Sequence, residues 1–327
     1  MTEIDRSFPS RRTTSFRMWS AEAAPPGRNG ASGGVRRRAG AALVAGALLL
    51  SVTACSEDGS DAPSARPSPK VSAPSVKPTP VWRTAPASIA ALGDSISVGF
   101  DACTVLSDCP EVSWSTGTSP KVDSLARRLL DHPAGHSWNH ARTGALMSDL
   151  PDQVDAAKAH RPELVTVLIG ANDACRSEVR AMTPAAAFRA DFTRAMTKLR
   201  RSLPRTQVYV AAVPDLLRLW SEGRKNPLGK QVWQLGICGS MLRDPDDLTE
   251  RAAERREKVR DRVKAYNTAL EEVCAEDSLC RFDPRVFDYR FTERQLSSWD
   301  WFHPGVRGQG ELAEMAFRTI TRKGSAA

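Results

Sequence analysis

Short apolar runs alternate with longer amphipathic segments from about residue 88 towards the end of the 327-residue chain. An unbroken apolar run of this kind is typical of a strand buried on both faces, whereas apolar residues three and four positions apart indicate one face of a helix. The pattern predicts strands at 88–92, 137–138, 164–169, 207–213 and 279–282. It predicts helices at 122–130, 150–160, 184–203, 248–273 and 306–320. This alternation predicts a three-layer α/β/α sandwich around a central, mostly parallel sheet, in which function gathers at the carboxyl ends of the strands.

One long stretch, residues 214–247, shows no clear period. It contains Trp220, Trp233 and Cys238. A connection of this length without structure of its own is uncommon and is often functional. Two interpretations stay open: a lid on the substrate side, or a surface excursion that a disulfide holds in place.

The N-terminal part is not predicted to form a packed domain. An almost uninterrupted apolar run at 39–54 follows three consecutive arginines, which is the layout of an export signal, and it is short for a membrane span. The run leads into Val-Thr-Ala-Cys, which resembles a bacterial lipobox, so residues 1–54 are predicted to be a signal peptide that is removed before an acylated Cys55. An uncleaved N-terminal anchor is the alternative, and both interpretations place the remainder outside the cytoplasm, anchored or secreted.

Residues 55–86 are dominated by Ser, Pro, Ala and Lys. Such a segment buries too little apolar surface to offset its ordering entropy, so we predict a disordered tether, followed by a catalytic domain at 87–327. Charge supports this division. Residues 1–54 hold eight Lys and Arg against three Asp and Glu, whereas residues 87–327 hold 34 against 32. The domain is therefore nearly neutral, which disfavours a nucleic-acid partner.

The chain has seven cysteines, and their number bears on the cellular compartment of the protein. Setting Cys55 aside leaves an even number, which suits disulfides in an oxidising environment. The paired short spacings of a four-cysteine zinc site are absent. Many connectivities are possible. Our hypothesis pairs Cys103 with Cys109, Cys175 with Cys238 and Cys274 with Cys280, since the first and last pairs would close small loops.

An aspartate stands three residues before a histidine in Asp-Trp-Phe-His-Pro, which begins at Asp300. On a tight turn, Asp300 can accept the Nδ1 proton of His303 and leave Nε2 free to take a proton from a nucleophile. Ser95, in the Gly-Asp-Ser that ends the first predicted strand, is the candidate nucleophile. Between them, the loop around Gly144 and the side chain of Asn172 can supply a backbone N–H and an amide to a developing oxyanion.

These four short motifs, in this order, resemble the sequence blocks of the SGNH (GDSL-type) hydrolases. The resemblance covers residues 88–320 and implies a flavodoxin-like form of the predicted sandwich. It implies a serine esterase without a cofactor, in which Ser95 is the nucleophile, His303 the base and Asp300 its orienting partner. It also implies an oxyanion hole formed by the backbone N–H groups of Ser95 and Gly144 with the amide of Asn172.

Other hydrolase architectures fit the sequence less well. An α/β-hydrolase would need a Gly-x-Ser-x-Gly elbow, which the chain lacks. His132, His136 and His140 are spaced as metal ligands on a helix would be, but Pro133 and Gly135 would break that helix, so we expect no metal. An acyltransferase acting on surface glycans stays open, because the same five residues would serve it. A catalytically silent, tethered binding module also stays open.

The sequence does not define the ester. A small molecule, a lipid and an acylated glycan are all compatible with the motifs. Three aromatic residues flank the Asp300–His303 pair: Trp299, Trp301 and Phe302. They could line a binding site for an acyl or aryl group, or they could pack beneath the loop. We expect a monomer that is attached to the membrane through an N-terminal lipid anchor.

Overall fold

The computed structural model describes residues 81–323. The predicted signal peptide, the lipobox cysteine Cys55 and most of the predicted tether lie outside the described residues. Within residues 81–323, no helix combines the length and the apolar character that a membrane span requires.

The start of the folded part lies a few residues earlier than the sequence suggested. Trp82 is buried, and its indole N–H donates to the backbone carbonyl of Ile320 at 2.9 Å. The Arg281 guanidinium lies over its ring, 4.3 Å from the centroid. The predicted tether at 55–86 is therefore too long at its C-terminal end, because Trp82 packs on the domain.

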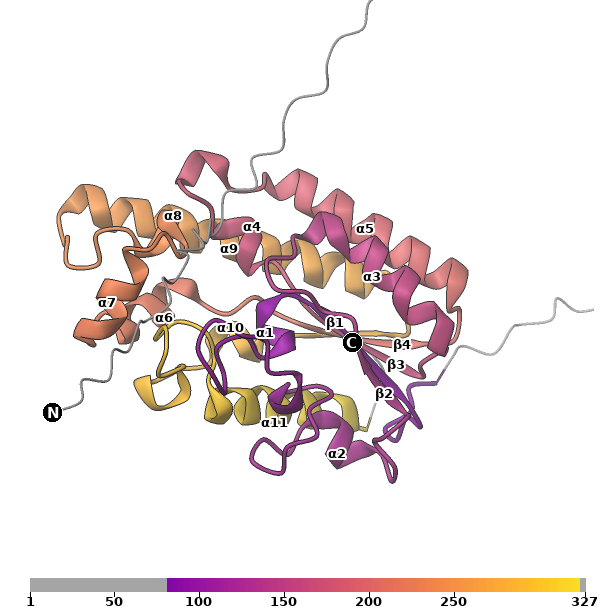
Figure 1. Ribbon diagram of the computed structural model, residues 1–327. Coiled ribbons are helices and arrows are strands. Elements are labelled where there is room, and N and C mark those ends of the chain that lie inside the picture. Colours follow the sequence, from indigo (N-terminus) through magenta and orange to yellow (C-terminus); the bar gives the residue numbers. More distant parts are fainter. Residues whose placement is uncertain (1–80, 324–327) are drawn as a thin grey trace, which may run out of the picture. The chain divides into compact units, whose positions relative to one another are not determined.

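A five-stranded parallel sheet forms the centre of the domain, in the order β2-β1-β3-β4-β5 (Figure 1). Every residue of β1, β3 and β4 is buried, which explains why these strands read as continuous apolar runs rather than as alternating ones. The five predicted strands are confirmed. Their bounds are β1 Ile89–Gly93, β2 Ser137–Asn139, β3 Leu164–Leu168, β4 Gln207–Ala211 and β5 Cys280–Asp283.

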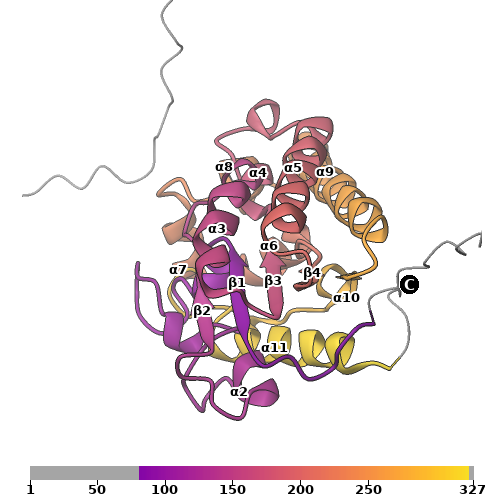
Figure 2. The same ribbon diagram turned by 90° about the vertical axis from the view of Figure 1, so that its right-hand side faces the viewer.

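Helices cover both faces of the sheet, as Figures 1 and 2 show, so the predicted sandwich is confirmed. On one face, the Phe188 ring of α5 stacks on Tyr266 of α9 at 4.0 Å between centroids. That face carries α3 Leu150–Ala157, α5 Ala185–Ser202 and α9 Glu250–Ala275, and the other carries α2 Leu125–Leu129 and α11 Val306–Thr321. Single-turn helices are α1 Ser95–Val98, α4 Ala171–Ala174 and α10 Arg285–Asp288, with 3-10 turns at Pro110–Val112, Met147–Asp149, Lys158–His160, Val179–Ala181 and Glu293–Gln295.

The prediction of an irregular segment at 214–247 is wrong. It contains three short helices, α6 Leu216–Gly223, α7 Pro227–Trp233 and α8 Gly239–Leu242. The side chains of Asp215 and Asn226 cap α6 and α7 by accepting backbone N–H groups of the first turn. Helices of one or two turns are too short to display an apolar period, which is why the pattern missed them. Figure 1 shows all three at the end of the sheet where β1 leads into α1.

Residues 81–323 contain three disulfides, Cys103–Cys109, Cys175–Cys238 and Cys274–Cys280, so the hypothesised pairing is confirmed. The second bridge joins the residue after α4 to the residue before α8. Next to it, the backbone N–H of Ser240 donates to the Arg176 carbonyl at 2.7 Å. The three-helix segment is thus fastened to the loop that follows β3.

The strand register brings three loops to one edge of the sheet. Gly93 at the end of β1 pairs with Leu168 at the end of β3, and Ala91 pairs with Asn139 at the end of β2. Because parallel strands end together, the loops that follow them must meet. These loops carry Ser95, Gly144 and Asn172.

Candidate active site

Ser95 lies on a sharp turn between β1 and α1. The turn begins at Gly93, whose φ of 154° few other residues adopt and where a Cβ would lie 2.3 Å from the Leu168 carbonyl oxygen. Asp94 follows, and its Oδ1 accepts the backbone N–H of Ile96 at 3.0 Å, which caps α1. The backbone geometry and the Asp94 cap together place Ser95 at the carboxyl edge of the sheet, as the first residue of a helix.

Ser95, His303 and Asp300 form one continuous chain of hydrogen bonds. The Ser95 Oγ lies 2.9 Å from His303 Nε2, and His303 Nδ1 lies 2.5 Å from Asp300 Oδ2. The other carboxylate oxygen of Asp300 accepts the backbone N–H groups of Phe302 and His303 at 2.9 and 3.0 Å. A fully buried carboxylate held by three hydrogen bonds favours the tautomer with the proton on Nδ1. Nε2 is then free to accept the serine proton.

The charges around this chain favour a histidine that takes up a proton. Burial alone would lower the pKa of His303, but the Asp300 carboxylate, helped by Asp101 and Asp94, raises it above the ordinary histidine value of 6.5. Burial opposes ionisation of Asp300, yet the neighbouring His303 and the backbone N–H groups hold its pKa below the usual range. Asp300 therefore stays ionised and stabilises an imidazolium.

The turn from Asp300 to His303 has a strained backbone and is contacted by helices α6 and α7. Trp301 has a φ of 52°, a conformation that bulky residues rarely adopt. The Trp233 indole N–H of α7 donates to the Asp300 carbonyl oxygen at 2.7 Å. A Cβ on Gly223 of α6 would lie 2.1 Å from the Trp301 carbonyl oxygen. The segment 214–247 therefore packs directly against the histidine loop.

The candidate oxyanion donors lie on the other side of the serine turn. The Asn172 side-chain amide donates to the Ala145 carbonyl at 3.1 Å, next to Gly144. The backbone N–H of Arg142 donates to the Gly93 carbonyl, also at 3.1 Å. The loop that contains Gly144 is thus tied both to the Ser95 turn and to Asn172. All five residues of the predicted site come together at one edge of the sheet.

Two further buried acids lie beside these loops. Burial raises the pKa of Asp94 and of Asp173 to about 6. Asp173 accepts the backbone N–H of Met147 at 2.9 Å, whereas Asp94 Oδ2 has no hydrogen-bond partner among the described residues. When ionised, Asp94 adds a negative charge that favours protonated His303.

A family model described as GDSL-like Lipase/Acylhydrolase matches residues 89–316, more than half of the chain. The chain belongs to this family. It is accordingly a carboxylic ester hydrolase by class, and esters are its expected substrates.

Solved structures related to this GDSL-like hydrolase are distant in sequence. A putative GDSL-like lipase from Parabacteroides merdae shares 18% identity over 75% of this chain and 99% of its own, with a TM-score of 0.45. An acetyl xylan esterase variant from Geobacillus stearothermophilus shares 18% over 72% and 94%, with a TM-score of 0.43. An extracellular lipase from Streptomyces rimosus shares 18% over 70% and 99%, with a TM-score of 0.44. No curated protein matches the chain.

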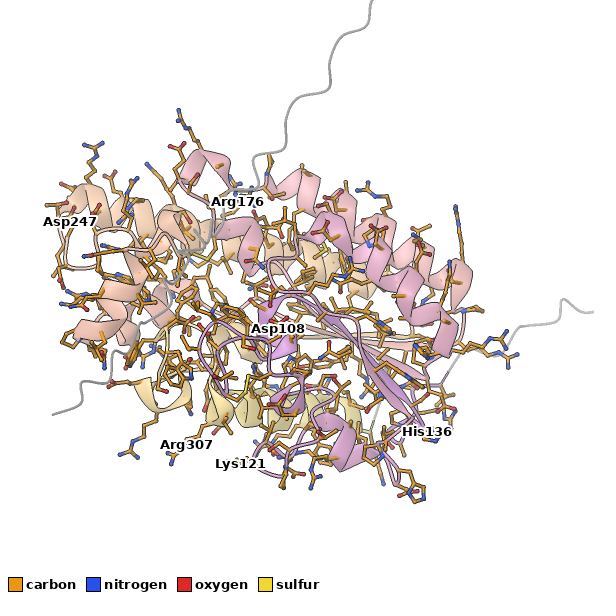
Figure 3. All side chains as sticks on the ribbon, in the orientation of Figure 1. Asp108, Lys121, His136, Arg176, Asp247 and Arg307 are labelled. Atoms are coloured by element: carbon orange, nitrogen blue, oxygen red, sulfur yellow. A yellow bond between two sulfur atoms is a disulfide. The ribbon has the colours of Figure 1, made fainter. Side chains whose placement is uncertain are left out.

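The spacing of His132, His136 and His140 had suggested metal ligands on one helix, but in this GDSL-like hydrolase His136 and His140 flank a strand. His136 precedes β2 and His140 follows it, so an extended strand separates them by roughly 13 Å. Figure 3 shows His136 at the lower right of the domain, just before the start of β2. His140 instead stacks with His160 at 5.4 Å between centroids.

The residues that support the histidine loop were not predicted from the sequence. Trp233 lies in the segment 214–247, which shows no clear period, and Asp101 belongs to none of the four motifs. Trp233 contacts Asp300 from 67 positions away in the sequence. A supporting contact of this kind leaves no local motif. The sequence offered one weak sign of this role for Trp233. A tryptophan that lies in a long connection, five residues before the disulfide cysteine Cys238, is a candidate for a buried contact.

Proposed function

We propose that this GDSL-like hydrolase cleaves carboxylic esters through an acyl-enzyme on Ser95, with His303 as general base and Asp300 as its orienting partner. The observation that carries the proposal is the unbroken hydrogen-bond chain from Ser95 Oγ through His303 to a wholly buried Asp300 carboxylate. A serine hydroxyl becomes an effective nucleophile when such a base removes its proton.

The proposed reaction has two halves. His303 Nε2 takes the Ser95 proton as Oγ attacks the ester carbonyl, and the imidazolium then protonates the departing alcohol. Water, deprotonated by the same His303, attacks the acyl-serine, and the imidazolium returns the proton to Ser95 Oγ as the acid is released. In both halves the carbonyl oxygen becomes negative, and the N–H groups of Ser95 and Gly144 with the Asn172 amide stabilise it. Asp300 stabilises the imidazolium without taking the proton.

Replacing the nucleophile tests this mechanism. Ser95→Ala should lower kcat for a short p-nitrophenyl ester by several orders of magnitude while the thermal midpoint changes little. Ser97→Ala is the matched control on the same turn. The Ser97 hydroxyl accepts from the Trp114 indole at 3.3 Å, so its loss should cost about 1 kcal/mol of stability and leave most of the turnover. A folded Ser95→Ala protein with near-parental turnover would contradict the mechanism.

The same experiment separates an enzyme from a silent binding module. A binding module would retain the ester without releasing p-nitrophenol, and the serine substitution would leave its behaviour unchanged. The hydrogen-bonded geometry of the Ser95 hydroxyl favours the enzyme, because a binding module has no need of a base aimed at a serine.

We further propose that the protein is exported and anchored through lipid on Cys55. The support is the charge-then-apolar N-terminus with its lipobox and the six cysteines of the described domain, which all form disulfides and suit an oxidising compartment. Cys55→Ser should move the protein from the membrane fraction to the soluble fraction or block its processing. Unchanged membrane retention after this substitution would favour the uncleaved anchor.

A further inference from the structure

A third carboxyl group lies behind the histidine pair. Asp101 is only 1% exposed, and an oxygen of its carboxyl, an oxygen of Asp300 and a ring nitrogen of His303 all lie within 4.8 Å of one another. The proposed mechanism does not use it. Two carboxyl groups this close and this deeply buried are costly when both are ionised, so they favour sharing a proton.

The backbone around Asp101 holds it in this position. Its φ is 55°, in the left-handed region that aspartate and asparagine tolerate better than most residues. Its N–H donates to the Ser107 carbonyl at 3.0 Å, and its carboxylate accepts the N–H of Leu106. The Cys103–Cys109 disulfide closes this same small loop. Asp101 is therefore fixed before any substrate arrives.

The same residue is tied to the histidine loop through its backbone. The Ser297 hydroxyl donates to the Asp101 carbonyl oxygen at 2.6 Å, and the Ser297 N–H donates to the His303 carbonyl at 2.8 Å. On the other side of the disulfide loop, Asp108, which is labelled in Figure 3, accepts the hydroxyl of Thr143 beside Gly144 at 2.5 Å. The loop thus touches both halves of the site.

The charge state of Asp101 depends on pH near neutrality. Burial, followed by the neighbouring Asp300 carboxylate, raises the pKa of Asp101 to about 6, although the Leu106 N–H and His303 oppose the shift. Below that value the protonated carboxyl can donate a hydrogen bond to Asp300. Above it, Asp101 is a further negative charge facing His303, together with Asp300 and with Asp94 from the serine turn.

We propose that Asp101 is a positioning residue of the catalytic pair: its carboxyl holds the Asp300 carboxylate and adjusts how readily His303 takes up a proton. The inference rests on the proposed function of Ser95, His303 and Asp300 and deepens it. Asp101 acts on the reaction through Asp300 and, by its charge, through His303.

Asp101→Asn is the decisive substitution in the full chain, because asparagine tolerates the same backbone conformation and keeps both a donor and an acceptor. It removes a negative charge that favours imidazolium. The acid limb of kcat/KM, where activity is lost as His303 becomes protonated, should therefore move to lower pH by about half a unit or more. Asp101→Ala should lower kcat by about tenfold, and the asparagine variant should recover most of that loss.

Asp123→Asn is the matched control. Asp123 also has a left-handed φ, of 50°, but its side chain is exposed and pairs with Arg127 and Arg128. The substitution makes the same change in net charge away from the site and should leave the acid limb in place. An acid limb of Asp101→Asn that coincides with those of the parent and the control would overturn the inference, even if the variant is less stable.

A second readout needs neither turnover nor a change at Asp101. In Ser95→Ala protein, the His303 ring resonances, identified by their absence after His303→Gln, should show a second ionisation at about pH 6 from Asp101. A single-step titration would overturn the inference. If instead the mechanism is wrong, Ser95→Ala will still hydrolyse esters, so the two failures are distinguishable.

Discussion

The two halves of the site are positioned by different parts of the molecule. Ser95 is placed mainly by backbone: an inner strand of the sheet, a glycine at which a Cβ would lie 2.3 Å from a backbone oxygen, and a one-turn helix. The loop that carries His303 is placed by contacts with other segments of the chain. The Trp233 indole donates to the Asp300 carbonyl, and on the other side the Asp101 carbonyl accepts the Ser297 hydroxyl. The nucleophile is therefore positioned by the sheet itself, whereas the base is positioned by contacts from segments outside the sheet.

This difference predicts how each half responds to change. Disturbing the serine turn should disturb the whole domain, because the turn continues strand β1 and its Asp94 N–H donates to the Leu168 carbonyl at the end of β3. Disturbing the supports of the histidine loop should lower catalysis while the domain stays folded. The supports contribute to the geometry of a few atoms, and catalysis is sensitive to displacements much smaller than those that cause unfolding.

Gly93→Ala should have the largest effect. The new Cβ would lie 2.3 Å from a backbone oxygen of β3, in a conformation that alanine adopts with strain. We expect a loss of more than about 3 kcal/mol in the free energy of unfolding, measured by urea denaturation. Gly135→Ala is the control, because φ at Gly135 is also positive but no atom lies within 4 Å of a Cβ there. Equal stability of the two variants would mean that the serine turn is not locked to the sheet.

Trp233→Phe should have a smaller effect, mainly on rate. Phenylalanine keeps most of the packing but removes the indole N–H that holds the Asp300 carbonyl. We expect kcat to fall about tenfold, with little change in KM and a stability loss of about 1 kcal/mol.

Trp82→Phe provides the comparison for that variant. It removes a buried indole hydrogen bond of similar length, to Ile320, on a different part of the domain. Its stability cost should match that of Trp233→Phe, but kcat should stay at the parental level. If both variants lose the same fraction of kcat, the rate effect reflects a general loss of stability. The claim that contacts from outside the sheet position His303 is then incorrect.

The same division explains what the sequence could predict. The Ser95 turn was predictable because strand, glycine and serine are contiguous, so one short motif specifies both the conformation and the chemistry. The Asp300–His303 pair was predictable for the same reason, since both partners lie on one turn. Asn172 follows a strongly apolar strand and could be placed by the same logic.

The supports of the site could not be predicted. Trp233 and Asp101 meet the histidine loop only through tertiary contacts, and neither belongs to a local pattern. The helices α6 to α8 were missed because each is too short to show a period. Trp82 was assigned to the tether because its surroundings are rich in proline, although a single buried aromatic side chain is enough to fix the start of the domain.

Covalent labelling tests the central claim most directly. A p-nitrophenyl phosphonate ester should react once per chain and release one equivalent of p-nitrophenol. Peptide mapping by mass spectrometry should then find the adduct on Ser95, and His303→Gln should slow labelling by at least about a hundredfold. An adduct on any other residue, or inactivation that leaves Ser95 unmodified, would contradict the account.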